Sequence, residues 1–159
     1  MQKKPVSIIV LAASIYLVVI AMKKTILTDK AEEIDYLART IWGEARGEGN
    51  SGMQAVANVI MNRVKAATWY GAGVKDVVLK KSQFSCWNDG DPNKAKMLAV
   101  TDSDISFRNA KYLAEQAVNG VLPDITGGAN HYHASNIRPY WADTDKMTVI
   151  IGNHVFYKL

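Results

Sequence analysis

The sequence predicts an α+β fold in which helices come first and a small antiparallel sheet comes last. Apolar residues recur at helical spacing as far as about residue 119, whereas β-branched and aromatic residues dominate from Ala129 onward. A third observation is the uncharged run from Val6 to Met22, which predicts one N-terminal hydrophobic helix ahead of the folded part.

The helical part divides into amphipathic segments separated by glycines. Asp29 and Glu32 resemble a capping box that opens a helix, and the apolar stripe of that helix runs to Ala45. Glycines then interrupt the pattern, and Ser51 with Gln54 resembles a second capping box. Further helices are expected at residues 74–79, 92–98 and 107–119.

The C-terminal part has the pattern of a β-hairpin. Residues 149–151 and 154–157 are rich in strand-forming side chains and flank a two-residue turn, Gly152 and Asn153. Residues 130–134 add a third short strand, which completes the expected sheet.

The N-terminal run is bracketed by two lysines on each side and would extend roughly 25 Å as a helix, against about 30 Å for a bilayer core. We therefore expect a weak signal anchor at residues 1–24 and an exported catalytic domain at residues 25–159. A cleaved signal peptide and a buried core helix are the alternatives. However, residues 19–21 offer no clear cleavage motif, and both faces of the run are apolar.

Charge and cysteine content narrow the function classes. The net charge of +4 comes from the four flanking lysines, because the other 15 basic residues equal the 15 acidic ones. The folded part therefore lacks the basic surface of a nucleic-acid-binding protein. Cys86 is the only cysteine, which rules out an internal disulfide and a cysteine metal cluster, and we expect it to be a buried thiol.

Glu44 is the candidate catalytic residue. It follows Trp42 and Gly43 where the helical pattern meets a series of glycines, so an acid stands in sequence beside a large aromatic ring. A carboxyl group half-buried against apolar surface retains its proton toward neutral pH, as a general acid requires. The alternative is an ordinary surface carboxylate at a helix end.

Several blocks of sequence, in this order, resemble the SleB-type cell-wall hydrolases, the family of spore cortex-lytic enzymes that also includes phage and bacterial peptidoglycan hydrolases. The matching blocks are residues 37–39, 42–48, 55–64, 83–87, 131–134, 139–142 and 151–157. The resemblance implies a lysozyme-like helical core and cleavage of the bond between N-acetylmuramic acid and N-acetylglucosamine. It also places Glu44 at the family's catalytic glutamate and requires no metal or cofactor.

The number of acids bears on the mechanism. The two-carboxylate route needs a second acid about 5 to 9.5 Å from the first, and the sequence offers no clear partner, since Glu48 is expected to pair with an arginine such as Arg46 or Arg63. A single acid fits a lytic transglycosylase, in which Glu44 protonates the leaving oxygen and then helps the muramoyl C6 hydroxyl attack. The resemblance implies this chemistry for part of the family.

Aromatic and polar side chains are expected to bind the glycan, because sugar rings stack on aromatic faces. The candidates are Phe84, Trp87, His131, Tyr132, His133, Tyr140 and Trp141; the alternative role for each is core packing. Strand alternation places His131 and His133 on one face and Tyr132 on the other, so only one set can line a cleft. His154 is expected to be a hydrogen-bonded structural histidine.

Two other functions remain open. His131, His133 and His154 with an acid could form the zinc site of an amidase or peptidase acting on peptide stems. The chain could also be a non-enzymatic, membrane-anchored protein that binds the cell wall.

The expected partners are peptidoglycan strands and, through the N-terminal segment, the membrane; no nucleic acid is expected, and the chain is expected to be monomeric. We expect an inner-membrane protein whose catalytic domain lies in the periplasm or outside the cell. This placement fits a phage signal-anchor-release endolysin, freed later into the periplasm, or a tethered bacterial remodelling enzyme.

Overall fold

The computed structural model describes residues 8–159, with side chains described from residue 14 onward. The chain forms two compact units, one ending at Glu32 and the other covering Glu33–Leu159. The division falls within helix α1, Ile8–Ala45.

The first unit exposes its apolar side chains, which include those of Ile15, Leu17, Ile26 and Leu27. In the part of the chain that the structure describes, no helix combines the length and apolarity needed to cross a membrane. The predicted anchor at residues 1–24 therefore gains no support here, and its first seven residues lie outside the described part.

Helix α1 is continuous, so the expected helix start at Asp29 and Glu32 is wrong. Residues 22–32 contain no glycine or proline that would stop a helix. The hydroxyls of Thr25 and Thr28 donate to carbonyls four residues earlier within the same helix. The two acidic residues are thus ordinary polar residues inside a helix, not a cap.

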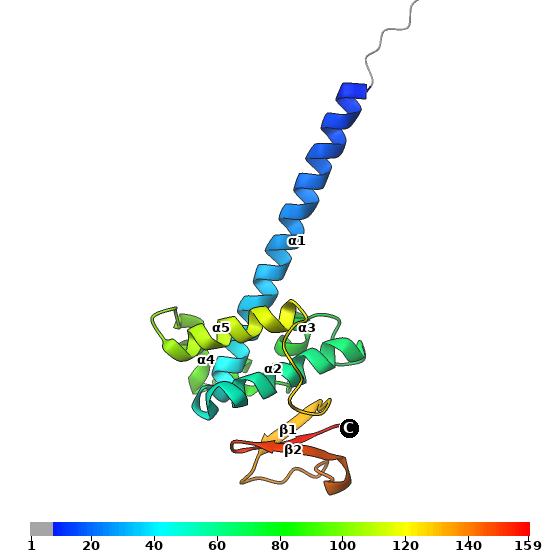
Figure 1. The fold of residues 1–159 in the computed structure, drawn as a ribbon. Helices are drawn as coiled ribbons and strands as arrows, with labels where there is room; N and C mark the ends of the chain where they lie inside the picture. The colour runs from blue at the N-terminus through cyan, green and yellow to red at the C-terminus, as the bar shows by residue number, and fades with distance from the viewer. Residues whose placement is uncertain (1–7) are drawn as a thin grey trace, which may run out of the picture. The chain divides into compact units, whose positions relative to one another are not determined.

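The second unit confirms the predicted order of helices followed by a small antiparallel sheet (Figure 1). The three strands lie in the order β1-β3-β2, and both pairings are antiparallel. The strands are β1 His131–Ala134, β2 Met147–Ile151 and β3 His154–Tyr157. The helices that follow α1 are α2 Gly49–Ala66, α3 Val74–Leu79, α4 Pro92–Ala99 and α5 Ile105–Val118, and the short 3-10 turns are η1 Arg46–Glu48, η2 Ser85–Trp87 and η3 Thr144–Lys146.

Helix α2 is buried on two sides. Met53, Val56 and Ile60 pack into the helical core, whereas Ala55 and Val59 belong to a second buried cluster with Phe156 of β3. The helix begins at Gly49 with no side-chain cap, so the expected capping box of Ser51 and Gln54 does not form. Because α2 packs against both layers, it joins the helices to the sheet (Figure 1).

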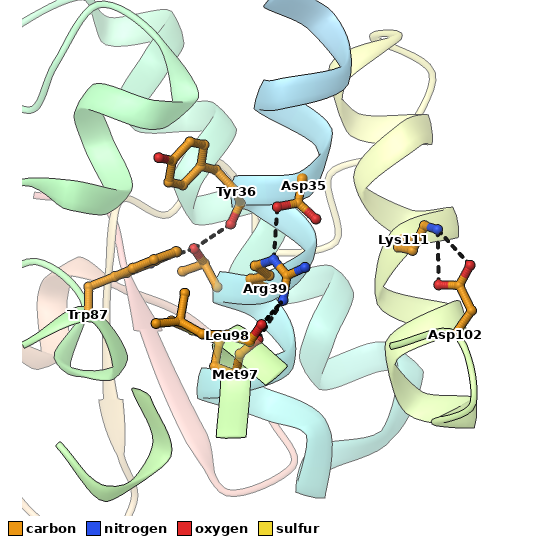
Figure 2. Close-up of polar contacts among 9 residues, drawn as sticks. Asp35, Tyr36, Arg39, Trp87, Met97, Leu98, Asp102 and Lys111 are labelled. Atoms are coloured by element: carbon orange, nitrogen blue, oxygen red, sulfur yellow. Dashed lines mark hydrogen bonds and ion pairs between the residues drawn. The ribbon is translucent and has the colours of Figure 1, made fainter. Parts of the chain in front are cut away.

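The last turns of α1 are held by Arg39 (Figure 2). Its Nε donates to Asp35 Oδ2 at 2.8 Å, and its Nη1 donates to the carbonyls of Met97 and Leu98 at 2.7 and 3.1 Å. These carbonyls belong to the end of α4, where a helix leaves acceptors without partners and favours a cation. Arg39 therefore fixes α1 against α4 just ahead of Glu44.

A second link joins α1 to η2. Trp87 Nε1 donates to Thr40 Oγ1 at 2.9 Å, and that hydroxyl donates to the carbonyl of Tyr36 at 2.6 Å. The Trp87 and Tyr36 rings also pack with their centroids 5.4 Å apart (Figure 2). The η2 turn is thereby held beside the C-terminal end of α1.

Arg63 joins α2 to the strand region. Its buried guanidinium donates to the Asn130 carbonyl at 2.7 Å and to Gln83 Oε1 at 2.9 Å. The same group lies 5.2 Å from the ring centroids of both Tyr70 and Phe84. One side chain thus connects the start of β1 with the loop that leads into η2.

Replacing this guanidinium should destabilise the fold. We expect Arg63→Met to lower the free energy of unfolding by roughly 2 to 4 kcal/mol, because the Asn130 carbonyl and the Gln83 amide oxygen lose their donors. Urea denaturation measures the loss. The control is Lys65→Met, an exposed position on the same helix, which should change stability by no more than about 0.5 kcal/mol. Equal losses in the two variants would contradict the role given to Arg63.

Candidate active site

Glu44 lies in the last turn of α1, where three segments of the chain meet. Its Oε1 accepts the backbone N–H of Cys86 in η2 at 3.1 Å, and its Oε2 accepts the hydroxyl of Tyr132 in β1 at 3.1 Å. The side chain is half-buried. A carboxylate held between a helix end, a turn and a strand is a positioned group and not a mobile surface acid.

The aromatic ring at Glu44 is that of Tyr132, not that of its sequence neighbour Trp42. Side chains two residues apart on a helix do not face each other. Trp42 donates through Nε1 to Asp104 at 3.3 Å, and its ring carries the guanidinium of Arg46 at 4.3 Å. The apolar surface that the sequence places at Trp42 is thus used for packing toward α5.

The electrostatics of the site keep both neighbours of Glu44 protonated. Burial raises the pKa of the Tyr132 phenol well above its usual range, and Glu44 adds to the shift when it is ionised. Burial likewise raises the pKa of the Cys86 thiol, and Glu44 adds to the shift. Tyr132 therefore remains a hydrogen-bond donor, and Cys86 is a neutral thiol and not a nucleophile.

Gly43 allows η2 to approach the helix. A Cβ at this position would lie 3.0 Å from Cys86 Cβ and 3.1 Å from Met97 Sδ. These distances are tighter than ordinary van der Waals contact, so a side chain at position 43 would press against η2 and α4, whereas glycine lets the Cys86 N–H come close to the carboxylate.

The other predicted glycan-binding residues form no hydrogen bond to Glu44 in the described part of the chain. His131 and His133 are on the opposite face of β1 from Tyr132 and pack against Trp141, with ring centroids 5.2 and 5.7 Å apart. Three more candidates occupy different surroundings: Phe84 is buried in the helical core, Trp87 is half-buried, and Tyr140 is fully exposed. Of the seven, Tyr132 is the one that bonds to Glu44 among the described residues, and the substrate roles of the others stay predictions.

Glu48 does not form the arginine pair expected from the sequence. Its Oε2 accepts the Asn153 backbone N–H at 2.8 Å, and its Oε1 accepts Asn153 Nδ2 at 3.1 Å. Arg46 bonds instead to Asn93, and Arg63 bonds to the groups described above. The hydrogen bonds from Asn153 lower the pKa of Glu48, and the bond from the backbone N–H has the larger effect.

His154 also differs from its expectation as a hydrogen-bonded histidine. Its Nδ1 is buried and has no hydrogen-bond partner among residues 8–159. The ring stands edge-on to Tyr132, with centroids 5.2 Å apart. Burial lowers the pKa of His154, while the carboxylates of Glu48 and Glu44 oppose that shift. Neither Glu48 nor His154 carried a sequence signal for this placement, because both contacts depend on how the hairpin packs.

The three histidines of the rival zinc site do not converge. His133 pairs in register with Val155, so it shares a face of the sheet with that residue, while His154 is on the face that bears Tyr132. Within the described part of the chain, no group of three His, Cys, Asp or Glu side chains could hold a metal ion.

Comparison with known proteins gives the family. The family profile described as Cell Wall Hydrolase matches residues 47–157. The chain belongs to this family. The match includes all three strands and begins three residues after Glu44.

Relatives within the cell-wall hydrolase family support the assignment. A spore cortex-lytic enzyme of Bacillus cereus is 32% identical over 131 residues, which are 79% of this chain and 44% of the relative. The chain thus spans less than half the length of that curated relative.

Two solved structures share the fold of this family member. The catalytic domain of the Bacillus cereus SleB protein is 30% identical, with a TM-score of 0.63 over 79% of this chain and 89% of that domain. The catalytic domain of the germination-specific lytic transglycosylase SleB from Bacillus anthracis is also 30% identical, with a TM-score of 0.62 over 79% and 93%. The resemblance stated from sequence blocks is therefore confirmed.

The close packing at Gly43 can be tested by adding one methyl group. We expect Gly43→Ala to lower the free energy of unfolding by roughly 1 to 3 kcal/mol, because the new Cβ overpacks against Cys86 and Met97. Thermal and urea denaturation measure the change. Gly47→Ala is the matched control, since a Cβ there meets no atom within 4 Å and should cost no stability. A Gly43→Ala variant as stable as the control would contradict this packing.

Proposed function

We propose that this cell-wall hydrolase cleaves peptidoglycan at the bond between N-acetylmuramic acid and N-acetylglucosamine, with Glu44 as its one catalytic acid. The observation that carries the proposal is the pair of hydrogen bonds that hold the Glu44 carboxyl group between η2 and β1. A general acid must be held in a fixed orientation toward the oxygen that it protonates.

The two hydrogen bonds indicate which oxygen of Glu44 can carry the acidic proton. The Cys86 N–H can only donate, so Oε1 of Glu44 acts as an acceptor. A tyrosine hydroxyl can donate or accept, so Oε2 can carry a proton beside Tyr132 or receive a hydrogen bond from it. Oε2 is therefore the atom that would deliver and regain the proton.

The reaction then proceeds in two steps on one carboxyl group. Glu44 gives its proton to the glycosidic oxygen while that oxygen leaves the anomeric carbon of the muramoyl residue. The resulting carboxylate takes the proton of the muramoyl C6 hydroxyl as O6 bonds to the anomeric carbon, which leaves a 1,6-anhydro end and consumes no water. Glu48 would not act as a second carboxylate in this scheme, because Asn153 occupies both of its oxygens. The Bacillus anthracis neighbour is described as a lytic transglycosylase, which favours this route.

Replacement of Glu44 tests the proposal. The full chain should release fragments with anhydromuramic ends from purified peptidoglycan, and Glu44→Gln should lower that rate by roughly 10² to 10⁴-fold, the usual contribution of a general acid. Mass spectrometry identifies the ends. Glu115→Gln, the same chemical change at an exposed position of α5, is the control and should leave the rate unchanged.

Other products would point to other functions. Reducing ends without anhydromuramic acid would indicate hydrolysis and reject the transglycosylase step. Peptide stems released from intact strands, with EDTA-sensitive activity restored by zinc, would indicate an amidase. Binding without any cleavage, unaffected by Glu44→Gln, would indicate a cell-wall binding protein.

We also propose that the uncharged run from Val6 to Met22 directs the domain out of the cytoplasm, as a membrane anchor from which it acts on the wall. Support comes from the apolar side chains that the first unit exposes, since such surfaces mark sites that bind a membrane or another protein. Host lysis by a phage enzyme and wall remodelling by a tethered bacterial enzyme both fit this location.

Cell fractionation tests this location. Wild-type protein should be found in the envelope fractions, whereas Val18→Lys, which places a charge in the run, should accumulate in the cytoplasm. Thr25→Lys, outside the run, is the control and should fractionate as wild type. Equal distributions of all three proteins would contradict export through this segment.

A further inference from the structure

Glu48 fastens the β2–β3 turn to the end of α1. It lies four residues after Glu44, in η1, and both of its carboxylate oxygens accept hydrogen bonds from Asn153, the second residue of the turn. The contact joins residues 105 positions apart in the chain. It is bidentate, so it fixes the direction of the turn as well as its distance.

Two glycines leave room for this carboxylate. Gly152 has φ of 56°, and a Cβ there would overlap Oε2 of Glu48. A Cβ at Gly52 in α2 would overlap the Cβ of Glu48. The Glu48 side chain therefore fits a space that glycines on both sides keep open.

The fastened turn connects to the catalytic acid through the sheet. His154 directly follows Asn153, and its ring stands edge-on to the Tyr132 ring at 5.2 Å. Tyr132 in β1 pairs in register with Phe156 in β3, the strand that begins with His154. The Tyr132 and Phe156 rings stack with their centroids 5.7 Å apart. The Tyr132 hydroxyl then donates to Glu44. Glu44 and Glu48 are four residues apart in the sequence and both bond to the sheet region. Glu44 bonds to Tyr132 of β1, and Glu48 bonds to Asn153 of the β2–β3 turn.

We propose that Glu48 is a positioning residue, which keeps Tyr132 within hydrogen-bonding distance of Glu44 by holding the β2–β3 turn. The inference rests on the proposed function, because the reaction that it supports is the acid chemistry of Glu44. Glu48 acts through Asn153 and the sheet and does not touch the substrate. The reaction needs the hydrogen-bonding geometry between residues 48 and 153 and not the charge of Glu48. Another pair of side chains with the same geometry can therefore replace Glu48 and Asn153.

A paired substitution separates geometry from charge. In Asn153→Asp, a carboxylate replaces the amide that donates to Glu48, and two carboxylates have no proton to share in a hydrogen bond. Adding Glu48→Gln supplies a donor at that point, while the new amide oxygen at position 48 still accepts the residue 153 backbone N–H. We expect Asn153→Asp in the full chain to lower kcat roughly 10 to 100-fold with a smaller change in KM, as misplacement of a catalytic group does. The double variant should recover most of the loss.

The control is Asp102→Asn, which removes the exposed ion pair with Lys111 (Figure 2) and should keep wild-type kcat. If Asn153→Asp alone fails to fold, Glu48→Met alone takes its place, because it removes both acceptors of the Asn153 hydrogen bonds and should also release the turn. Wild-type kcat in the single variants would overturn the proposal. A double variant no more active than Asn153→Asp would overturn it too, since the Glu48 carboxylate itself would then be required.

A second readout does not depend on activity. Cys86 is the only cysteine, so labelling with ¹⁵N-cysteine gives one amide resonance, that of the N–H bonded to Glu44. Release of the turn should shift this resonance in Asn153→Asp, and the double variant should return it. An unchanged resonance in Asn153→Asp would show that the turn does not act on Glu44. Full activity of Glu44→Gln would defeat the proposed function alone, and the resonance would still decide the role of Glu48.

Discussion

The site depends on the two hydrogen bonds that meet at the Glu44 carboxyl group. One donor is a backbone N–H of η2 and the other is a hydroxyl on β1, 88 positions along the chain from Glu44. Neither can be in place unless the helix end, the turn and the sheet occupy fixed positions. Arg39 holds α1 to the end of α4, Trp87 holds α1 to η2, and Arg63 holds α2 to the start of β1. These three contacts thus support the geometry of the site.

Much of the fold could be predicted because its signals are local. The two-residue turn at Gly152 and Asn153, and the helix start at Asp91, where the side chain caps the Asn93 N–H, are set by neighbouring residues. The expected helix start at Asp29 failed because a polar pair with capping-box spacing also occurs inside exposed helices. Only a residue that stops a helix, such as glycine or proline, would have separated the two cases.

The site was predictable in part. Glu44 could be chosen from its place at the helix end, but its partner could not, because strand alternation leaves open which face of β1 meets the helix. The fold places Tyr132 on that face, while His131 and His133 lie on the other. The expectation that Glu48 pairs with an arginine, based on its charge, was wrong. Its partner is the uncharged Asn153, whose backbone N–H and side-chain amide together bond to both carboxylate oxygens.

The single buried thiol has a consequence for where the protein can fold. Cys86 has no second cysteine to join, and a thiol whose pKa is raised by burial forms little of the thiolate that exchanges with disulfides. The protein therefore has the same covalent bonds in oxidising and in reducing surroundings, because it forms no internal disulfide. The domain should reach one structure whether it folds among cytosolic reductants or after exposure to an oxidising medium, with no help from disulfide-forming catalysts.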